Sequence, residues 1–300
     1  MAKSKSKKNK KLGTLPGKSK ATSAGKIPQM ITKAIGLQNQ GDFIGAEAIY
    51  QQVLQLDPQN YDALNMLGLI ATTLGMNDVA IELTSAAIEV NADISFAYSN
   101  RANAYKQLGD YAKAFDDYNK ALEIDPNDFD ANNNLGSLYI VTNDYPNALA
   151  HLKKALQVNP NASEVHTNLG AAYLLRNRLD EAANHLETAL NLNPNAPNTY
   201  STLAKVFRQR LMTDEARHCY EAGIAVNNQL PSLYEGLGSL CLQLGDKKGA
   251  IESYRRVLEL SPDAATALMG LVTAKDEGLN DEIMEEFASI KDDASDRQNK

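Results

Sequence analysis

A period of 34 residues runs through most of this 300-residue chain and constrains its fold more than any other feature. Counted from Ile27, it gives seven repeats that end at residue 264, and position numbers below refer to places within a repeat. Position 8 is Gly or Ala in every repeat, and position 20 is always Ala. A period of about 20–50 residues is typical of solenoids and similar arrays, in which each repeat packs mainly against its neighbours. The residues at position 8 are Ala34, Gly68, Ala102, Gly136, Gly170, Ala204 and Gly238.

Each repeat has the pattern of two helices joined by a turn. In the third repeat, the spacing of a helix face occurs in residues 98–105 and again in residues 114–122. Position 15, between the helices, is Gly in four repeats and Asn in two, and both residues tolerate the left-handed backbone that closes a helix. Leu211 takes this position in the sixth repeat, so we expect a changed turn there. The sequence therefore predicts an all-α fold, in which the small residues at positions 8 and 20 let paired helices approach closely.

This pattern resembles the tetratricopeptide repeat (TPR) over residues 27–264. The resemblance implies a right-handed α-solenoid of helix–turn–helix TPR units, whose first helices line a concave surface. Position 4 is often Trp in the family, whereas Asn132 and His166 make it polar in the two middle repeats. Residues 265–300 are expected to form a C-terminal capping helix and an acidic tail that is helical or disordered.

Residues 1–26 differ in composition from the rest of the chain. They hold nine of the 30 basic residues and none of the 37 acidic ones, which gives residues 27–300 a net charge of −16. A segment so poor in apolar residues is expected to be a disordered tail. It has no apolar run of the kind found in signal peptides, so we expect a cytoplasmic protein. The composition favours a solubilising leader over contact with nucleic acid or an anionic membrane, since aromatic residues and an amphipathic face are missing.

The first helices carry a series of asparagines that predicts a binding site. Position 6, which faces inward in TPR arrays, is Asn in three consecutive repeats, at Asn100, Asn134 and Asn168. An amide side chain has one acceptor and two donors, so it can bind the main chain of an extended peptide without reading its sequence. The series is similar to the asparagine ladder in the TPR region of O-linked N-acetylglucosamine transferases, although Asn is abundant throughout this chain. The predicted peptide-binding residues are Asn100, Asn103, Asn133, Asn134, Asn168, Lys205 and Arg208.

The TPR resemblance and the series of asparagines are consistent with two functions. The first is a non-catalytic protein–protein interaction scaffold that binds an extended polypeptide in the concave groove. The alternative is the substrate-recruiting TPR region of a modular glycosyl- or sulfotransferase, because residues 261–300 resemble the linker of TPR–sulfotransferase proteins. Binding of chaperone tails by a carboxylate clamp is not expected, since Ser99 and Glu164 stand where that clamp needs Lys.

Motifs typical of catalytic, metal-binding or cofactor-binding sites are weak in this sequence. We predict no catalytic residue, no metal, no cofactor and no small-molecule substrate for this chain. The four histidines include His151 and His185, which share position 23 of successive repeats and are interpreted as surface residues. Cys219 and Cys241 are too few for a disulfide-rich secreted scaffold.

Overall fold

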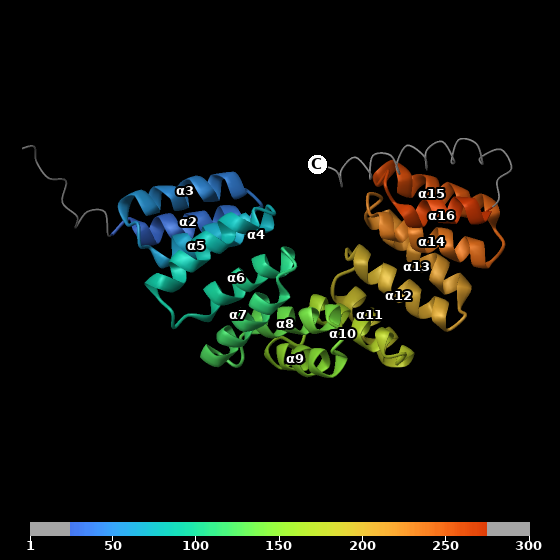
Figure 1. Cartoon of the computed structure of the whole chain (residues 1–300), viewed down its shortest axis with the longest axis horizontal. Helices are drawn as coiled ribbons and strands as arrows, with labels where there is room; N and C mark the ends of the chain where they lie inside the picture. The colour runs from blue at the N-terminus through green and yellow to red at the C-terminus, as the bar shows by residue number, and fades with distance from the viewer. Residues whose placement is uncertain (1–24, 275–300) are drawn as a thin grey trace, which may run out of the picture. The chain divides into compact units, whose positions relative to one another are not determined.

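The computed structural model describes residues 25–274, where all regular secondary structure is α-helical (Figure 1). The chain divides into two compact units, and we call residues 25–124 the N-terminal unit and residues 125–274 the C-terminal unit. The helices of the N-terminal unit are α2 (Ile27–Asn39), α3 (Phe43–Leu56), α4 (Tyr61–Thr73), α5 (Asn77–Val90), α6 (Ser95–Gln107) and α7 (Tyr111–Ile124). Those of the C-terminal unit are α8 (Phe129–Val141), α9 (Tyr145–Val158), α10 (Ser163–Leu175), α11 (Leu179–Leu192), α12 (Pro197–Gln209), α13 (Thr213–Val226), α14 (Pro231–Gln243), α15 (Lys247–Leu260) and α16 (Ala265–Ala274).

The helix boundaries repeat with the period of the sequence. From α2 to α14, every even-numbered helix has 13 residues and is the first helix of a repeat, and every odd-numbered helix from α3 to α15 has 14 and is the second. The helix α16 begins 34 residues after α14, as the first helix of an eighth repeat would. The prediction of an all-α array of helix–turn–helix repeats is confirmed.

Small residues at position 8 bring the two helices of a repeat together. A Cβ added to Gly136 would lie 2.6 Å from Cγ of Leu152 and 3.3 Å from the carbonyl oxygen of Ala148. The sequence argument named only the alanine at position 20, whereas the nearest atoms belong to the larger side chain at position 24. Because Leu152 is fully buried, a larger residue at position 8 would overpack the repeat.

The turn of the sixth repeat has the same conformation as the others. Leu211 has φ 63°, close to the 78° of Gly109 at the same position of the third repeat. In both turns the next residue donates a backbone hydrogen bond of 2.9 Å to a carbonyl five residues earlier, from Met212 to Phe207 and from Asp110 to Tyr105. The expectation of a changed turn is therefore wrong, because the helix packing on either side holds Leu211 in the left-handed region that its side chain disfavours.

Hydrophobic clusters form within each unit. In the N-terminal unit, Tyr50 and Val53 are fully buried in a cluster that joins α2, α3 and α4. In the C-terminal unit, one cluster runs from Leu149 on α9 to Leu240 on α14, and a second joins α14, α15 and α16. Since every cluster draws on neighbouring repeats, burial stabilises the stacking of repeats as well as each helix pair.

The two ends of the chain lie outside the described residues. The expected basic tail, apart from its last two residues, and the expected acidic tail after residue 274 belong to these parts. Across the described range, the helices are too short or too polar to cross a lipid bilayer.

Candidate functional site

We call Asn100, Asn134 and Asn168, which stand at position 6, the ladder asparagines. Asn100 and Asn168 each form a side-chain pair with an asparagine of a neighbouring first helix. In the N-terminal unit, Nδ2 of Asn100 on α6 donates to Oδ1 of Asn65 on α4 over 2.8 Å. In the C-terminal unit, Nδ2 of Asn168 on α10 donates to Oδ1 of Asn133 on α8 over 2.9 Å. Both pairs join position 6 of one repeat to position 5 of the repeat before it. The same contact therefore occurs in each unit at equivalent places.

Each pair fixes the orientation of the amide at position 6. The bond uses one of the two amide hydrogens of Asn100 or Asn168, which leaves the other hydrogen and Oδ1 for a ligand. Both donors are half-buried, whereas Asn65 is 1% exposed. Asn134 lies at the equivalent position of α8 and is also half-buried. Sequence reasoning missed Asn65 because Met66 occupies position 6 of its repeat.

The remaining polar residues of the first helices differ in accessibility. Asn103 is half-buried, and its Oδ1 accepts a hydrogen bond from the hydroxyl of Tyr118 on α7. Ser99 on α6 and Ser201 on α12 are only 2% and 4% exposed. These two serines are therefore too buried to contact a ligand and are excluded from the candidate site.

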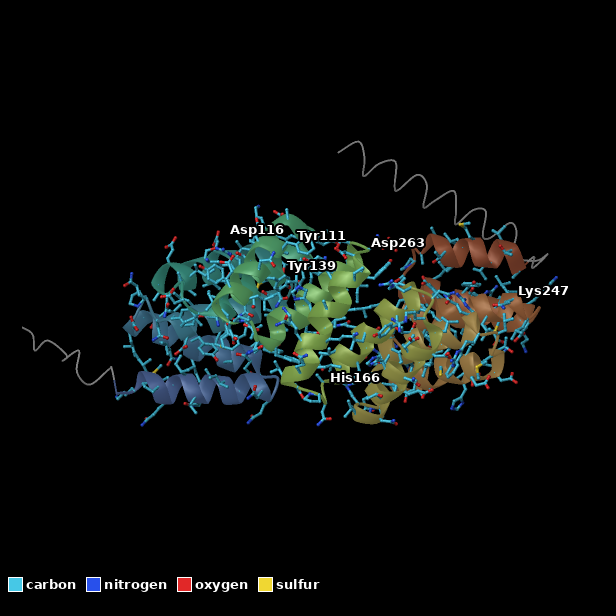
Figure 2. The ribbon with its side chains drawn as sticks, turned by 90° about the horizontal axis from the view of Figure 1, so that it is seen from below. Tyr111, Asp116, Tyr139, His166, Lys247 and Asp263 are labelled. Carbon is cyan, nitrogen blue, oxygen red and sulfur yellow. The ribbon has the colours of Figure 1, made fainter. Side chains whose placement is uncertain are left out.

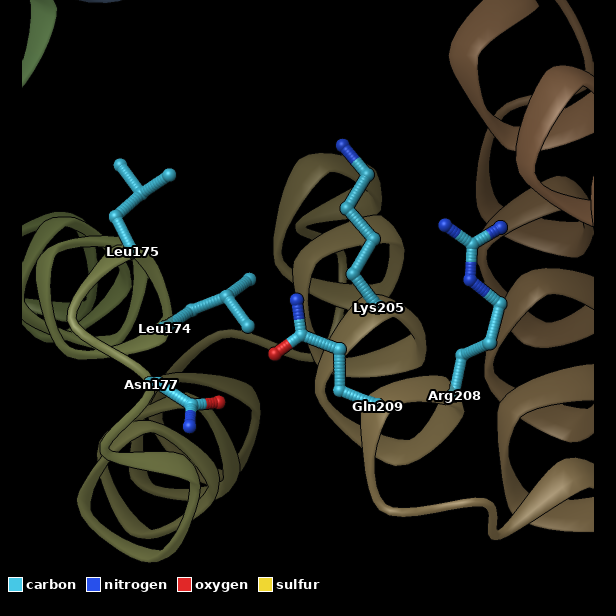
Figure 3. A pocket seen from close by; sticks show the side chains of 6 residues that line it. All are labelled: Leu174, Leu175, Asn177, Lys205, Arg208 and Gln209. Carbon is cyan, nitrogen blue, oxygen red and sulfur yellow. The ribbon is translucent and has the colours of Figure 1, made fainter.

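Lys205 and Arg208 lie at a pocket between α10 and α12. The pocket has a volume of about 360 Å³, and Figure 3 shows the side chains of both cations extending to the same side of α12. Lys205 is exposed, while Nη1 of Arg208 donates a 2.9 Å hydrogen bond to Oγ of Ser239 on α14. Sequence reasoning named only the two cations, because apolar and amide residues at positions 12, 13 and 15 carry no distinctive signal. The other lining residues are Leu174, Leu175, Asn177 and Gln209.

The interpretation of His151 and His185 as surface residues is wrong. Each is half-buried and contacts the polar residue at position 4 of its own repeat. Nδ1 of His151 lies 3.0 Å from Oδ1 of Asn132, and Nδ1 of His185 lies 3.0 Å from Nδ1 of His166. Figure 2 labels His166 among the side chains of the structure. Burial lowers the pKa of His151, with a smaller contribution from Lys154. Burial also lowers the pKa of His185, followed by the effects of His166 and Lys153.

The polar residues at position 4 also connect successive repeats. Nδ2 of Asn132 donates to the carbonyl of Pro126 over 3.1 Å, and Nε2 of His166 lies 3.2 Å from the carbonyl of Pro160. The hydroxyl of Tyr234 reaches the equivalent carbonyl of Asn228 at 3.3 Å. These contacts satisfy buried polar groups at the repeat junctions, which explains the histidines through packing.

A buried ion pair takes the place of an apolar contact in the third repeat. Arg101 stands at position 7, which is Leu in five repeats, and binds the carboxylate of Asp117 through Nε at 2.7 Å and Nη2 at 2.8 Å. Its Nη1 donates to Oγ of Ser85 over 3.0 Å. Hydrogen bonding to Asp117 raises the pKa of Arg101 above its ordinary value. Both carboxylate oxygens of Asp117 accept hydrogen bonds, and these contacts link α5, α6 and α7.

Cys219 has the properties of a packing residue. Its side chain is buried, and burial raises its pKa to about 11, with smaller contributions from Glu187 and Glu215. The thiol is therefore protonated near neutral pH, which argues against a nucleophilic role.

Comparison with known proteins decides the family. Four family models described as tetratricopeptide repeat match residues 37–99, 95–128, 117–150, 142–206 and 202–265. The chain belongs to the tetratricopeptide repeat family. Together the matches span residues 37–265, from the last turn of α2 to the first residue of α16.

Curated relatives share one stretch of TPR sequence with this chain. A probable UDP-N-acetylglucosamine–peptide N-acetylglucosaminyltransferase SPINDLY of Solanum lycopersicum is 32% identical over 96 residues, which are 32% of this chain and 10% of that protein. The mitochondrial import receptor subunit TOM70 of Rattus norvegicus is 32% identical over 92 residues, or 30% of this chain and 15% of that protein. The chain thus spans a small part of the length of these relatives.

Solved structures share the TPR fold. The Cut9–Hcn1 hetero-tetramer of APC/C gives a TM-score of 0.67 at 17% identity, and covers 82% of this chain and 55% of that one. A tetratricopeptide repeat protein from Parabacteroides merdae gives 0.64 at 22% identity, and covers 84% of this chain and all of that one. At these identities the similarity shows the fold alone.

Proposed function

We propose that this TPR chain is a non-catalytic interaction scaffold that binds an extended polypeptide along the inward faces of its first helices. TPR repeats imply protein–protein interaction. The observation that carries the finer proposal is the repeated amide pair, Asn65 with Asn100 and Asn133 with Asn168. Each pair presents a hydrogen-bond donor and an acceptor in a fixed orientation.

The chemistry of these amides suits a main-chain ligand. An extended polypeptide presents alternating N–H and C=O groups, which pair with the remaining hydrogen and Oδ1 of an asparagine. A neutral hydrogen bond contributes about 0.5–1.5 kcal/mol, so useful affinity requires several equivalent contacts. Pairing with a neighbouring asparagine lowers the ordering cost of each amide on binding, because its orientation is already set.

The alternative function is the substrate-recruiting region of a modular transferase. The observation that favours it is the 32% identity to the SPINDLY protein over 96 residues. The complete reading frame of the gene tests it. Continuation after Lys300 into a catalytic domain supports the recruiting role, and a stop codon at that point favours the free-standing scaffold.

We also propose a cytoplasmic location, which is consistent with Cys219 and Cys241 as free thiols. Fluorescence microscopy of the tagged chain tests it.

The Lys-rich residues 1–26 are proposed as a solubilising leader. If they instead bound DNA or anionic lipid, their deletion would remove a salt-sensitive affinity measured with duplex DNA or phosphatidylserine vesicles.

Replacement of the three ladder asparagines tests the main proposal. Dodecamer peptides selected from a random displayed library on the wild-type chain provide the ligands, and fluorescence anisotropy gives their affinities. The variant Asn100→Ala/Asn134→Ala/Asn168→Ala should bind them roughly tenfold or more weakly, because it loses up to three hydrogen bonds. Circular dichroism should show unchanged helicity.

A matched control removes asparagines from the second helices. Asn119 on α7 and both Asn184 and Asn191 on α11 are exposed, so their triple replacement by Ala should leave affinity unchanged. Equal binding by the ladder variant and the control variant would contradict the proposal, as would failure to select any peptide.

A further inference from the structure

In the part of the chain that the structure describes, the pocket between α10 and α12 holds two cations without a carboxylate partner. Among the described residues, several arginines of the C-terminal unit form ion pairs, such as Arg178 with Glu181 and Arg256 with Glu259. Neither Lys205 nor Arg208 lies within ion-pair distance of a carboxylate in residues 25–274. This arrangement stands out in a chain whose residues 27–300 have a net charge of −16.

The two cations share one face of α12. They are three residues apart, which places their side chains next to each other on a helix. Figure 3 shows both extending in the same direction, with the Nζ of Lys205 and the guanidinium of Arg208 at the tips. The 2.9 Å bond to Ser239 uses one guanidinium N–H and holds the group in place, which leaves further donors for a ligand. Because like charges repel at this spacing, a bound anion would stabilise the pair.

The wall of the pocket that α10 forms is apolar. Leu174 and Leu175 come from the last residues of α10, and Figure 3 shows Leu174 extending toward Gln209 of α12. The volume of about 360 Å³ is near the lower limit of ligand pockets, so it suits one or two side chains. The pocket therefore combines a cationic wall with an aliphatic wall.

We propose that this pocket binds an Asp or Glu side chain of the polypeptide ligand, with an apolar residue of the same ligand against Leu174. The inference rests on the proposed function, since the ligand main chain runs along the first helices that carry the ladder. The amides bind any sequence, and the pocket selects an acidic residue at one place in it. Hydrogen bonds between a guanidinium or ammonium group and a carboxylate are stronger than neutral ones, which gives the pocket its selectivity.

A positional-scanning library of dodecamer peptides with amidated C-termini tests the proposal on the full chain. One position at a time is fixed as Glu, Gln, Asp, Asn or Lys. The wild-type chain should prefer Glu or Asp over Gln or Asn by about tenfold at one position, and the preference should fall as salt rises. The variant Lys205→Gln/Arg208→Gln should lose this preference, so that it binds the Glu, Gln, Asp and Asn peptides with similar affinity.

Two further variants sharpen the result. Lys205→Glu/Arg208→Glu should shift the preference to Lys at the same position, which loss of folding cannot produce. Lys154→Gln/Arg255→Gln removes two exposed cations from the second helices α9 and α15 and should retain the acidic preference.

The outcomes separate this proposal from the proposed function. Persistence of the acidic preference in Lys205→Gln/Arg208→Gln overturns the pocket assignment. An acidic preference that appears only when the same peptides carry a free C-terminal carboxylate also overturns it. If neutral peptides bind but acidic ones show no advantage, the pocket proposal fails and the scaffold stands. If the ladder variant binds every peptide as tightly as the wild type, the scaffold proposal fails instead.

Discussion

Replacement of Leu211 by Gly tests whether helix packing holds the turn of the sixth repeat in a strained conformation. Its backbone has φ 63°, and its side chain is 75% exposed. The left-handed conformation costs about 1–2 kcal/mol for an ordinary residue, and the exposed side chain gains little by burial. Glycine removes that cost, but its greater freedom in the unfolded chain costs about 0.5–1 kcal/mol. Leu211→Gly should therefore raise the free energy of unfolding by roughly 0.5–1 kcal/mol.

Leu244 is the matched control. It ends the first helix of the seventh repeat at φ −87°, directly before Gly245, and is 45% exposed. Leu244→Gly relieves no strain, so it should lower the free energy of unfolding by about 1 kcal/mol. The two leucine-to-glycine changes are thus predicted to have opposite signs.

Urea unfolding followed by circular dichroism measures both effects on the full chain. Because repeat arrays can unfold in stages, native-state hydrogen exchange should locate the change in α12 and α13 for Leu211→Gly and in α14 and α15 for Leu244→Gly. If both variants lose stability equally, the strain assigned to Leu211 is absent and the reasoning is refuted.

Two further predictions concern buried polar groups. Arg101→Leu should destabilise the N-terminal unit by about 3 kcal/mol, because it leaves the carboxylate of Asp117 buried and unpaired, whereas Arg101→Leu/Asp117→Leu should unfold near the wild-type urea midpoint. A double variant as unstable as the single one would contradict this account. Stability should also fall as pH drops below about 6.5, since burial lowers the pKa of His151 and His185 in the folded chain and the unfolded chain takes up protons first. The loss of urea stability between about pH 7.5 and about pH 5.5 should be smaller in His151→Gln/His185→Gln, and an unchanged loss would exclude these histidines as its source.

The architecture was predictable because it depends on features that recur in the sequence. Small residues at positions 8 and 20 and the turn residue at position 15 fix where helices begin and end. The first helices accordingly begin every 34 residues, from Ile27 to Ala265. Even the atypical Leu211 follows the pattern, because the packing of the flanking helices outweighs the preference of one residue.

The partners of individual side chains were harder to predict. The bond between Asn100 and Asn65 joins two different positions of neighbouring repeats, and it depends on how one repeat is rotated against the next. The contact between His166 and His185 likewise depends on how two helices face each other within a repeat. The position of a residue within its repeat shows that a polar side chain occurs there. It gives no indication of which side chains contact each other. Prediction therefore succeeded for the helices that carry these residues and failed for the contacts between their side chains.

The central claim is that the amides of the first helices bind the main chain of an extended polypeptide. N-methylation of a selected peptide, one amide at a time, tests it most directly, because each methyl group removes a main-chain donor and leaves the side chains intact. The account predicts that methylation at several separate amides weakens binding to the wild-type chain by roughly tenfold, and has much less effect on Asn100→Ala/Asn134→Ala/Asn168→Ala. Binding that is insensitive to every N-methyl group, or equally sensitive in both proteins, would contradict the claim.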